Sequence, residues 1–231
     1  MRYLIVGASR GIGLALSKEL PSQEDELICV SRTAPQIKPS RGKDVQWVYA
    51  DATSESFSSI IKDAVGNKPV DVFIYAAGIS EKAAFDELTE KEISDVLRTN
   101  LESFVRLAQA LLSNLVSSEQ KMVVAIASTC GLPNEGASKV TYAASKFGMR
   151  GAAHALREVL RPHNGRVTVI SPGSIASDID VEEGTEAVFE KYGGGRMPTQ
   201  DIVETVRYLL SLSPAACVKE IHIPATPDTD V

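Results

Sequence analysis

The chain has few of the residues that mark disulfide-bonded, metal-binding or membrane-spanning proteins. It contains three cysteines and three histidines in 231 residues. The cysteines, Cys29, Cys130 and Cys217, stand far apart in separate apolar stretches, with neither a paired nor a zinc-type spacing. We therefore expect small buried thiols in a reducing compartment. No apolar run approaches the roughly 20 residues that a transmembrane helix needs.

An excess of positive charge is also lacking. The sequence has 24 Lys and Arg against 30 Asp and Glu, for a formal net charge of −6. The basic residues form no cluster of the kind that binds nucleic acid or a membrane surface. The first residues lead directly into an apolar run, which leaves no room for a signal peptide. We expect a soluble cytoplasmic protein with no nucleic-acid or membrane partner.

Short β-branched runs alternate with longer segments of helical periodicity, which is typical of a parallel sheet covered by helices on both faces. Several runs, such as 122–127, are apolar throughout, as expected for strands that are buried on both faces. The sequence predicts a single α/β domain over residues 1–231 with a doubly wound parallel sheet. The seven expected strands are 2–6, 26–31, 45–50, 70–75, 122–127, 166–171 and 218–223.

Helical spacing of apolar residues predicts four helices, at 12–20, 90–115, 142–160 and 199–210. The segments 32–44 and 173–198 are polar or glycine-rich, and we expect loops there. The stretch 174–198 is long enough to be a substrate-binding lid.

A glycine-rich turn, Gly7 to Gly13 with the sequence GASRGIG, follows the first expected strand and opens the first expected helix. Glycines at such a turn let backbone amides and the helix N-terminus approach a pyrophosphate. Glycines also make ordinary tight turns, but the order of strand, turn and helix predicts a dinucleotide-binding site.

Tyr142 and Lys146 stand four residues apart in an expected helix and therefore share one of its faces. If this face lines a pocket, the phenol could give a proton to a substrate while the nearby ammonium stabilises the phenolate. Pairs with this spacing also occur by chance on solvated helices, so the pair alone decides little.

The glycine spacing and the Tyr142–Lys146 pair together make the chain resemble the short-chain dehydrogenases and reductases, over the range 7–177. The resemblance implies a Rossmann-type fold and an oxidoreductase that transfers a hydride between a nicotinamide and a carbonyl or alcohol substrate. It also implies a homodimer, with a tetramer as the alternative.

The resemblance assigns roles to individual residues. Tyr142 would be the general acid and base, and the Lys146 cation together with the positive nicotinamide of the oxidised cofactor should favour its phenolate. Ser128 would orient the substrate oxygen, and Asn100 would help to hold a relay water. Taken singly, Asn100, Ser128 and Asp51 have structural readings, as polar groups that satisfy a backbone, a turn or a helix cap. The implied cofactor-binding residues are Gly7, Ser9, Arg10, Gly11, Ile12, Gly13, Arg32, Asp51, Ala52, Ala77, Gly78, Tyr142, Lys146, Pro172, Gly173, Ile175 and Ser177.

Two arginines decide the expected cofactor. Arg32 follows the second strand, where an acid would accept the ribose 2′-hydroxyl of NAD, and Arg10 adds a positive charge inside the glycine turn. Both suit a 2′-phosphate, so we expect NADP(H). The contrary reading makes them exposed surface arginines.

The chain departs from the family pattern at two places. Tyr75 opens the sequence YAAG where relatives carry an asparagine that is thought to brace the sheet, so Tyr75 must brace or pack there in another way. The C-terminus lacks the glycine-rich turn that often ends the last strand in relatives, which leaves a tetramer in doubt.

Three functions fit the sequence to different degrees. A carbonyl reductase acting on ketones, aldehydes or 3-oxoacyl groups is favoured by the intact Ser128, Tyr142 and Lys146. A cofactor-sensing regulator on the same fold is the alternative from another class. Sugar-nucleotide epimerase chemistry, the third, usually needs a longer C-terminal substrate domain, for which we expect no room in 231 residues.

Overall fold

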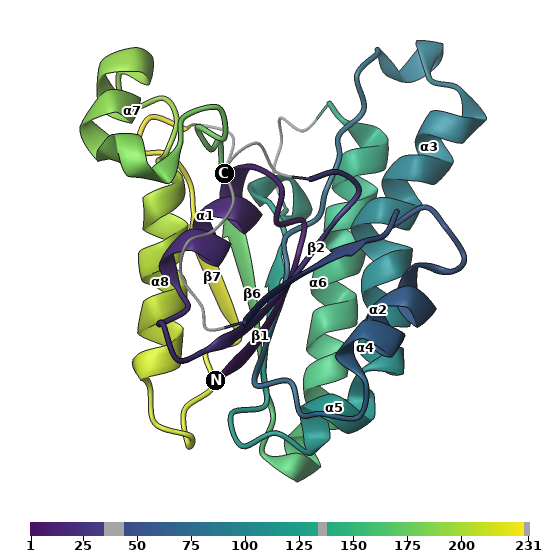
Figure 1. Ribbon diagram of the computed structural model, residues 1–231. Coiled ribbons are helices and arrows are strands. Elements are labelled where there is room, and N and C mark those ends of the chain that lie inside the picture. The colour runs from purple at the N-terminus through teal and green to yellow at the C-terminus, as the bar shows by residue number, and fades with distance from the viewer. Residues whose placement is uncertain (35–43, 134–137, 229–231) are drawn as a thin grey trace.

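The computed structural model describes residues 1–34, 44–133 and 138–228, and seven strands within them form one parallel sheet (Figure 1). The strand order is β3-β2-β1-β4-β5-β6-β7. The order reverses between β1 and β4, where ligand crevices of doubly wound sheets open. The strands are β1 (Arg2–Val6), β2 (Glu26–Ser31), β3 (Asp44–Tyr49), β4 (Val72–Tyr75), β5 (Met122–Ile126), β6 (Arg166–Pro172) and β7 (Glu220–Ile223). The predicted fold and its seven strands are confirmed, with shifts of one or two residues at their ends.

Helices cover both faces of the sheet (Figure 1). One face carries α1 (Gly11–Glu19) and α8 (Thr199–Ser211), with α7 (Gly184–Tyr192) near the end of α8. The other face carries α2 (Phe57–Val65), α3 (Glu90–Leu97), α4 (Ser103–Ala110), α5 (Leu112–Val116) and α6 (Val140–Leu160). The short helical turns are η1 (Phe85–Glu87), η2 (Arg98–Glu102), η3 (Thr129–Gly131), η4 (Arg161–His163) and η5 (Val181–Glu183).

The alternation of side chains along each strand builds two separate cores. On β1, Leu4 and Val6 pack in the core under α2, α4 and α6, while Tyr3 and Ile5 pack in the core under α1 and α8. Because both faces of the strand are buried from Tyr3 to Val6, these four residues are apolar without alternation.

The long helix expected at 90–115 is wrong, because the chain forms α3, the π-helical turn η2, α4 and α5 in its place. In η2 the amide of Ser103 bonds to the carbonyl of Arg98, five residues back instead of four. Such π-turns occur mostly as single turns inside α-helices, frequently at functional sites. The apolar spacing continues through the turn, so the periodicity did not reveal it.

The loop expected at 173–198 is also wrong, since it contains η5 and α7. Its base is closed by two backbone hydrogen bonds, from Met197 to Ser174 and from Ala176 to Met197. The buried amine of Lys18 on α1 holds η5 through Asp180, at 2.8 and 2.9 Å. The segment is therefore an ordered flap attached to α1. The other expected loop, 32–44, lies largely outside the described residues.

Helix α2 was not predicted, although Phe57, Ile61 and Val65 are buried at a spacing of four along it. The helix is short and begins with a serine-rich stretch, so the spacing of its apolar residues did not stand out in the sequence. Within the described ranges, no helix is long and apolar enough to cross a membrane. The same ranges hold no cluster of three or more His, Cys, Asp or Glu side chains suited to a metal ion.

Candidate active site

The predicted site residues meet at one cavity of about 390 Å³ at the carboxyl ends of the strands. Ser128 lines it together with every predicted cofactor-binding residue except Gly13. Asn100 lies behind the wall, to which its neighbour Thr99 contributes. The lining residues from the prediction are Gly7, Ser9, Arg10, Gly11, Ile12, Arg32, Asp51, Ala52, Ala77, Gly78, Ser128, Tyr142, Lys146, Pro172, Gly173, Ile175 and Ser177.

In the glycine turn, the backbone lies so close to neighbouring backbone atoms that side chains would not fit. Gly7 has φ +91°, and a Cβ there would lie 2.6 Å from the amide nitrogen of Ala77. A Cβ on Gly13 would lie 2.2 Å from the carbonyl oxygen of Gly7, so this glycine serves the packing of α1 against the turn. Arg10 precedes α1 without capping it through its side chain. The first residues of α1, Gly11 and Ile12, line the cavity, and a helix N-terminus without a side-chain cap is suited to an anion.

Tyr142 and Lys146 lie on α6 beside the end of β5. The amine nitrogen of Lys146 is 5.5 Å from the centre of the Tyr142 ring. Lys146 is buried and donates a hydrogen bond of 3.0 Å to the carbonyl oxygen of Ile126. Burial disfavours the charged amine and lowers the pKa of Lys146 to about 8.

The protein chain alone does not lower the pKa of Tyr142, although Lys146 lies beside the ring. Burial raises the pKa of Tyr142 above its ordinary value, and a hydrogen bond with Ser128 opposes the shift without reversing it. The phenol is therefore protonated at neutral pH. Ser128 follows β5, and its hydroxyl also accepts a hydrogen bond from the amide of Cys130 at 3.2 Å.

Asn100 connects two walls of the site from inside the π-turn η2. Its side-chain oxygen accepts from the amide of Ile79, and its nitrogen donates to the carbonyl of Ile79, both at 2.8 Å. The same nitrogen donates to the Ser145 hydroxyl at 2.9 Å, which donates to the carbonyl of Tyr142 at 2.7 Å. The side chain thus ties the loop after β4 to α6.

Tyr75 supports the turn that carries Asn100, which confirms the expectation that it braces this region. Its buried hydroxyl donates to the carbonyl of Thr99 at 2.7 Å and contacts the hydroxyl of Ser103. Ser103 donates to the same carbonyl at 3.0 Å. The ring packs edge-on against Phe104, with centroids 5.4 Å apart. These contacts replace the hydrogen bond between the Ser103 amide and the Thr99 carbonyl that a regular α-helix would have.

The charged residues expected at the adenosine end are exposed at the cavity rim. Asp51 accepts hydrogen bonds from the amide and hydroxyl of Thr53, both at 2.9 Å. Partial burial would raise the pKa of Asp51, but the bonds from Thr53 and the charge of Arg32 outweigh it and lower that pKa. Arg10 and Arg32 are both exposed there.

Sequence reasoning missed Glu81. Its carboxylate accepts a hydrogen bond of 2.9 Å from the amide of Tyr142, in the first turn of α6. A negative charge at a helix N-terminus is favourable, and the preceding Lys139 offers no side-chain cap. Because 61 residues separate the two partners, no spacing in the sequence could have pointed to this contact.

Comparisons with known proteins point to one family. A family model described as short chain dehydrogenase matches residues 2–187. The 3-oxoacyl-(acyl-carrier-protein) reductase FabG of Aggregatibacter actinomycetemcomitans is 28% identical over 231 residues, covering 94% of this chain and 95% of the relative. The ketoacyl reductase HetN of Nostoc sp. is 29% identical over 183 residues, covering 75% of this chain and 63% of that protein, less than two thirds of its length.

Solved structures share the fold. A short chain dehydrogenase from Leptospira borgpetersenii with bound NAD+ has a TM-score of 0.79 and 26% identity, and the match covers 96% of this chain and 90% of that one. A short chain dehydrogenase family protein from Francisella tularensis also has a TM-score of 0.79, with 23% identity and 97% coverage of both chains.

Replacing Tyr75 by Phe removes one hydroxyl and keeps the ring. We expect the free energy of unfolding to fall by about 1–3 kcal/mol, because the buried carbonyl of Thr99 and the hydroxyl of Ser103 lose a partner. Urea unfolding measures this change. Tyr3→Phe is the matched control, since Tyr3 is equally buried and its hydroxyl meets the Met1 sulfur at 3.8 Å. Equal losses in the two variants would contradict a special role for Tyr75.

The pKa of Lys146 predicts a pH-dependent stability. Folding lowers this pKa from an unfolded value of about 10.4 to about 8, so the unfolded chain binds more protons between these values and stability rises with pH. Lys146→Met removes the buried amine. Without cofactor, we expect this variant to be more stable than the wild type at pH 7. The difference in their free energies of unfolding, measured with urea, should shrink by about 2 kcal/mol when the pH rises from 7 to 9.5. A constant difference would show that Lys146 keeps an ordinary pKa.

Proposed function

The chain belongs to the short chain dehydrogenase family, and from this premise we propose that it is an NADP(H)-dependent oxidoreductase that interconverts a carbonyl and an alcohol. The observation that carries the proposal is the meeting of Ser128, Tyr142 and Lys146 at one cavity with the glycine turn. A proton donor, a hydrogen-bond donor and a buried cation at a dinucleotide crevice are what carbonyl reduction requires.

A nicotinamide dinucleotide fits the residues of the cavity. The backbone of Gly7 and Gly11 and the start of α1 line the cavity, where a helix N-terminus suits a pyrophosphate. Arg10 and Arg32 supply positive charge at the adenosine end, which supports NADP(H) over NAD(H). When bound, the reduced cofactor supplies the hydride.

The side chains of this protein would then orient and protonate the substrate oxygen. Ser128 donates a hydrogen bond that orients the carbonyl, and Tyr142 gives its phenolic proton to the oxygen as negative charge develops there. Burial keeps this phenol protonated at neutral pH, which suits the reductive direction. The ammonium form of Lys146, below its pKa of about 8, stabilises the phenolate that remains. Asn100, tied to Ile79 and Ser145, holds the wall through which a water would return the proton.

A 3-oxoacyl thioester is the first substrate to test, followed by simple ketones and aldehydes. Support comes from the relatives, which include a 3-oxoacyl-(acyl-carrier-protein) reductase matched over almost the whole chain. We propose that the flap at 174–198 forms the lid over this substrate. The bonds from Lys18 to Asp180 fix the lid to α1, the helix whose start lines the cavity.

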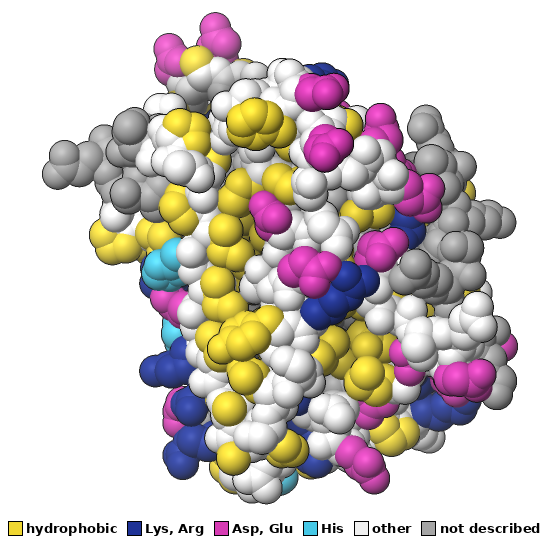
Figure 2. Space-filling view, turned by 90° about the vertical axis from the view of Figure 1, so that its left-hand side faces the viewer, with side chains coloured by type: hydrophobic (Ala, Val, Ile, Leu, Met, Phe, Trp, Pro, Cys, Tyr) yellow, Lys and Arg dark blue, Asp and Glu magenta, His cyan; other side chains and the backbone are white. Residues whose placement is uncertain are grey.

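We propose a cytoplasmic homodimer that pairs through α4 and α6. Val105 on α4 and Phe147 on α6 are exposed by 46% and 44%, which supports burial of this face against a second copy. The side that carries α7 and α8 also gathers hydrophobic side chains at the surface (Figure 2), with Tyr208 of α8 exposed by 54%. A tetramer that uses this second face is therefore the alternative.

Replacing Tyr142 by Phe removes the proton donor and keeps the ring. We expect kcat for NADPH oxidation with the best carbonyl substrate to fall by about 10²- to 10⁴-fold, because general acid catalysis is lost. NADPH binding, measured by fluorescence titration, should change by less than about threefold. Tyr208→Phe, an exposed tyrosine on α8, is the control.

Unchanged turnover in Tyr142→Phe would remove Tyr142 from the reaction. The wild type could also bind NADPH tightly but oxidise it with no ketone, dicarbonyl or acyl thioester. In that case the proposal of an enzyme fails, and a cofactor-sensing regulator becomes the favoured function.

Replacing Arg32 by Asp tests the cofactor assignment. We expect NADPH binding to weaken by about 10- to 100-fold, because a charge-assisted contact to the 2′-phosphate becomes a repulsion, while NADH binding changes by less than about threefold. Titration with both cofactors measures this split. Arg161→Asp makes the same charge change at the far end of α6 and should leave both affinities unaltered. Equal losses for the two cofactors would argue against a phosphate contact.

A further inference from the structure

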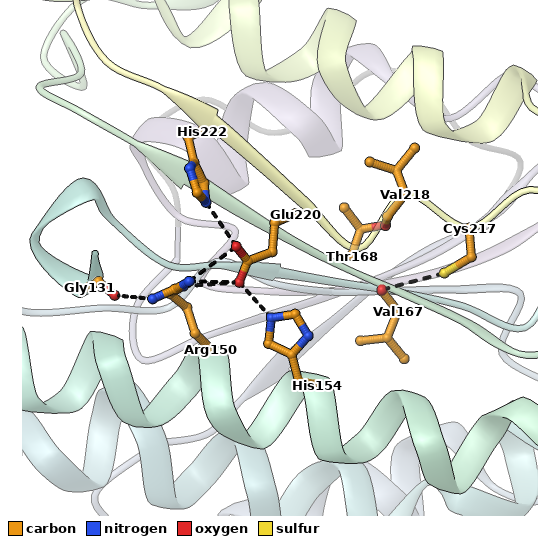
Figure 3. Close-up of polar contacts among 9 residues, drawn as sticks. All are labelled: Gly131, Arg150, His154, Val167, Thr168, Cys217, Val218, Glu220 and His222. Atoms are coloured by element: carbon orange, nitrogen blue, oxygen red, sulfur yellow. Dashed lines mark hydrogen bonds and ion pairs between the residues drawn. The ribbon is translucent and has the colours of Figure 1, made fainter. Parts of the chain in front are cut away.

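A polar network outside the cavity continues the catalytic face of α6 (Figure 3). Tyr142, Lys146, Arg150 and His154 follow one another at intervals of four residues, so they lie along one side of the helix. The first two belong to the candidate active site. The next two meet the carboxylate of Glu220, on the last strand β7.

Glu220 is the centre of the network. Arg150 donates to both of its oxygens at 3.1 Å, and His154 and His222 contact them at 2.5 and 2.9 Å (Figure 3). The side chains of Arg150 and Glu220 are each only 20% exposed. Partial burial would raise the pKa of Glu220, but the bonds from Arg150 and the histidines lower it to about 2. The carboxylate is therefore charged at every pH at which the protein would work.

Arg150 also binds the loop after β5. Its remaining terminal nitrogen donates to the carbonyl of Gly131 at 2.7 Å (Figure 3). The amide of Gly131 in turn donates to the carbonyl of Ser128 at 2.9 Å. The guanidinium thus joins a carboxylate of β7 to the short turn that begins at Ser128.

Gly131 also fixes the distance between this turn and α6. A Cβ at Gly131 would lie 2.8 Å from the carbonyl carbon and 2.9 Å from the carbonyl oxygen of Lys146. The turn therefore rests directly on the backbone of the helix at Lys146. Holding Gly131 in this contact sets where Ser128 lies relative to Lys146 and Tyr142.

Backbone pairing and other hydrogen bonds also hold β7 in the sheet, independently of the network. The strand pairs with β6 from Glu220 to Ile223, and the amide of Gly173 bonds to the carbonyl of Ile223 at 2.8 Å. Thr168 further holds the carbonyl of Val218 at 2.6 Å (Figure 3). The Glu220 carboxylate additionally fixes the side chain of Arg150, which in turn fixes Gly131 through its hydrogen bond.

We propose that Glu220 and Arg150 are positioning residues for the reaction, which clamp the Ser128 turn onto α6 from the C-terminal strand. The inference rests on the proposed function for its effect on turnover. Its effect on the Ser128 turn is independent of that function. Charge-assisted hydrogen bonds are among the strongest that side chains make, so their loss should let the turn open more often.

Cys130 provides a probe inside the turn itself, because it lies between Ser128 and Gly131 and is partly exposed. Its alkylation by iodoacetamide, followed by mass spectrometry of the peptide, reports opening of the turn without any substrate. Buried Cys29 in the same molecule is the internal reference for global unfolding.

The test compares Arg150→Met and Glu220→Gln with His222→Gln, a control that removes one contact to Glu220 and touches neither Arg150 nor Gly131. We expect the first two variants to raise the Cys130 rate about tenfold and to lower kcat, with NADPH affinity changed by less than about twofold. His222→Gln should resemble the wild type. Glu220→Gln keeps the shape of the side chain, so it remains informative if Arg150→Met does not fold.

Unchanged Cys130 rates and kcat in both variants would overturn the proposal, and so would an equal rise in His222→Gln, which would indicate general loosening of β7. If the wild type reduces no carbonyl at all, the proposed function alone fails, because the Cys130 rates still decide whether the network holds the turn.

Discussion

The contact between helix α6 and the end of strand β5 is the constraint on which the rest of the site depends. Lys146 reaches the carbonyl of Ile126 with a buried amine, and the backbone of Gly131 rests on the helix at the same residue. Burying an amine against a carbonyl is costly, as its lowered pKa indicates. The surrounding structure must therefore hold α6 in place, and it does so at three points: through Glu81 at the first turn, through Asn100 and Ser145 in the next, and through Arg150 beyond.

Sequence patterns predicted the sheet and the position of the site, because both depend on local order. Strands buried on both faces are apolar throughout, and residues at the carboxyl ends of parallel strands must share one edge. Tyr142, Ser128 and the glycine turn therefore meet as expected. The π-turn at Asn100 could not be predicted, because apolar spacing continues through it. The contacts of Glu81 and Glu220 join residues 61 and 70 apart, and no local spacing encodes them.

The pKa of Tyr142 shows where residue types alone mislead. A tyrosine four residues from a lysine suggests a lowered phenol pKa, yet burial raises it, because a phenolate in the cavity wall loses more hydration than the chain's own groups restore. The same burial lowers the pKa of Lys146. Burial thus shifts both groups toward their neutral forms relative to water, although Lys146 still carries its proton below a pH of about 8. A charged ligand beside them would shift both, so protonation at this site should depend on what the cavity binds.

The most direct test of the account is isotope transfer. NADPH that carries deuterium on its transferable position is incubated with the protein and a 3-oxoacyl thioester, and the product is analysed by mass spectrometry. The account predicts one deuterium on the carbinol carbon of the hydroxyacyl product. A reduced product without the label would contradict direct hydride transfer, and the absence of any reduced product across ketones, aldehydes and thioesters would contradict the assignment of this cavity as a carbonyl reduction site.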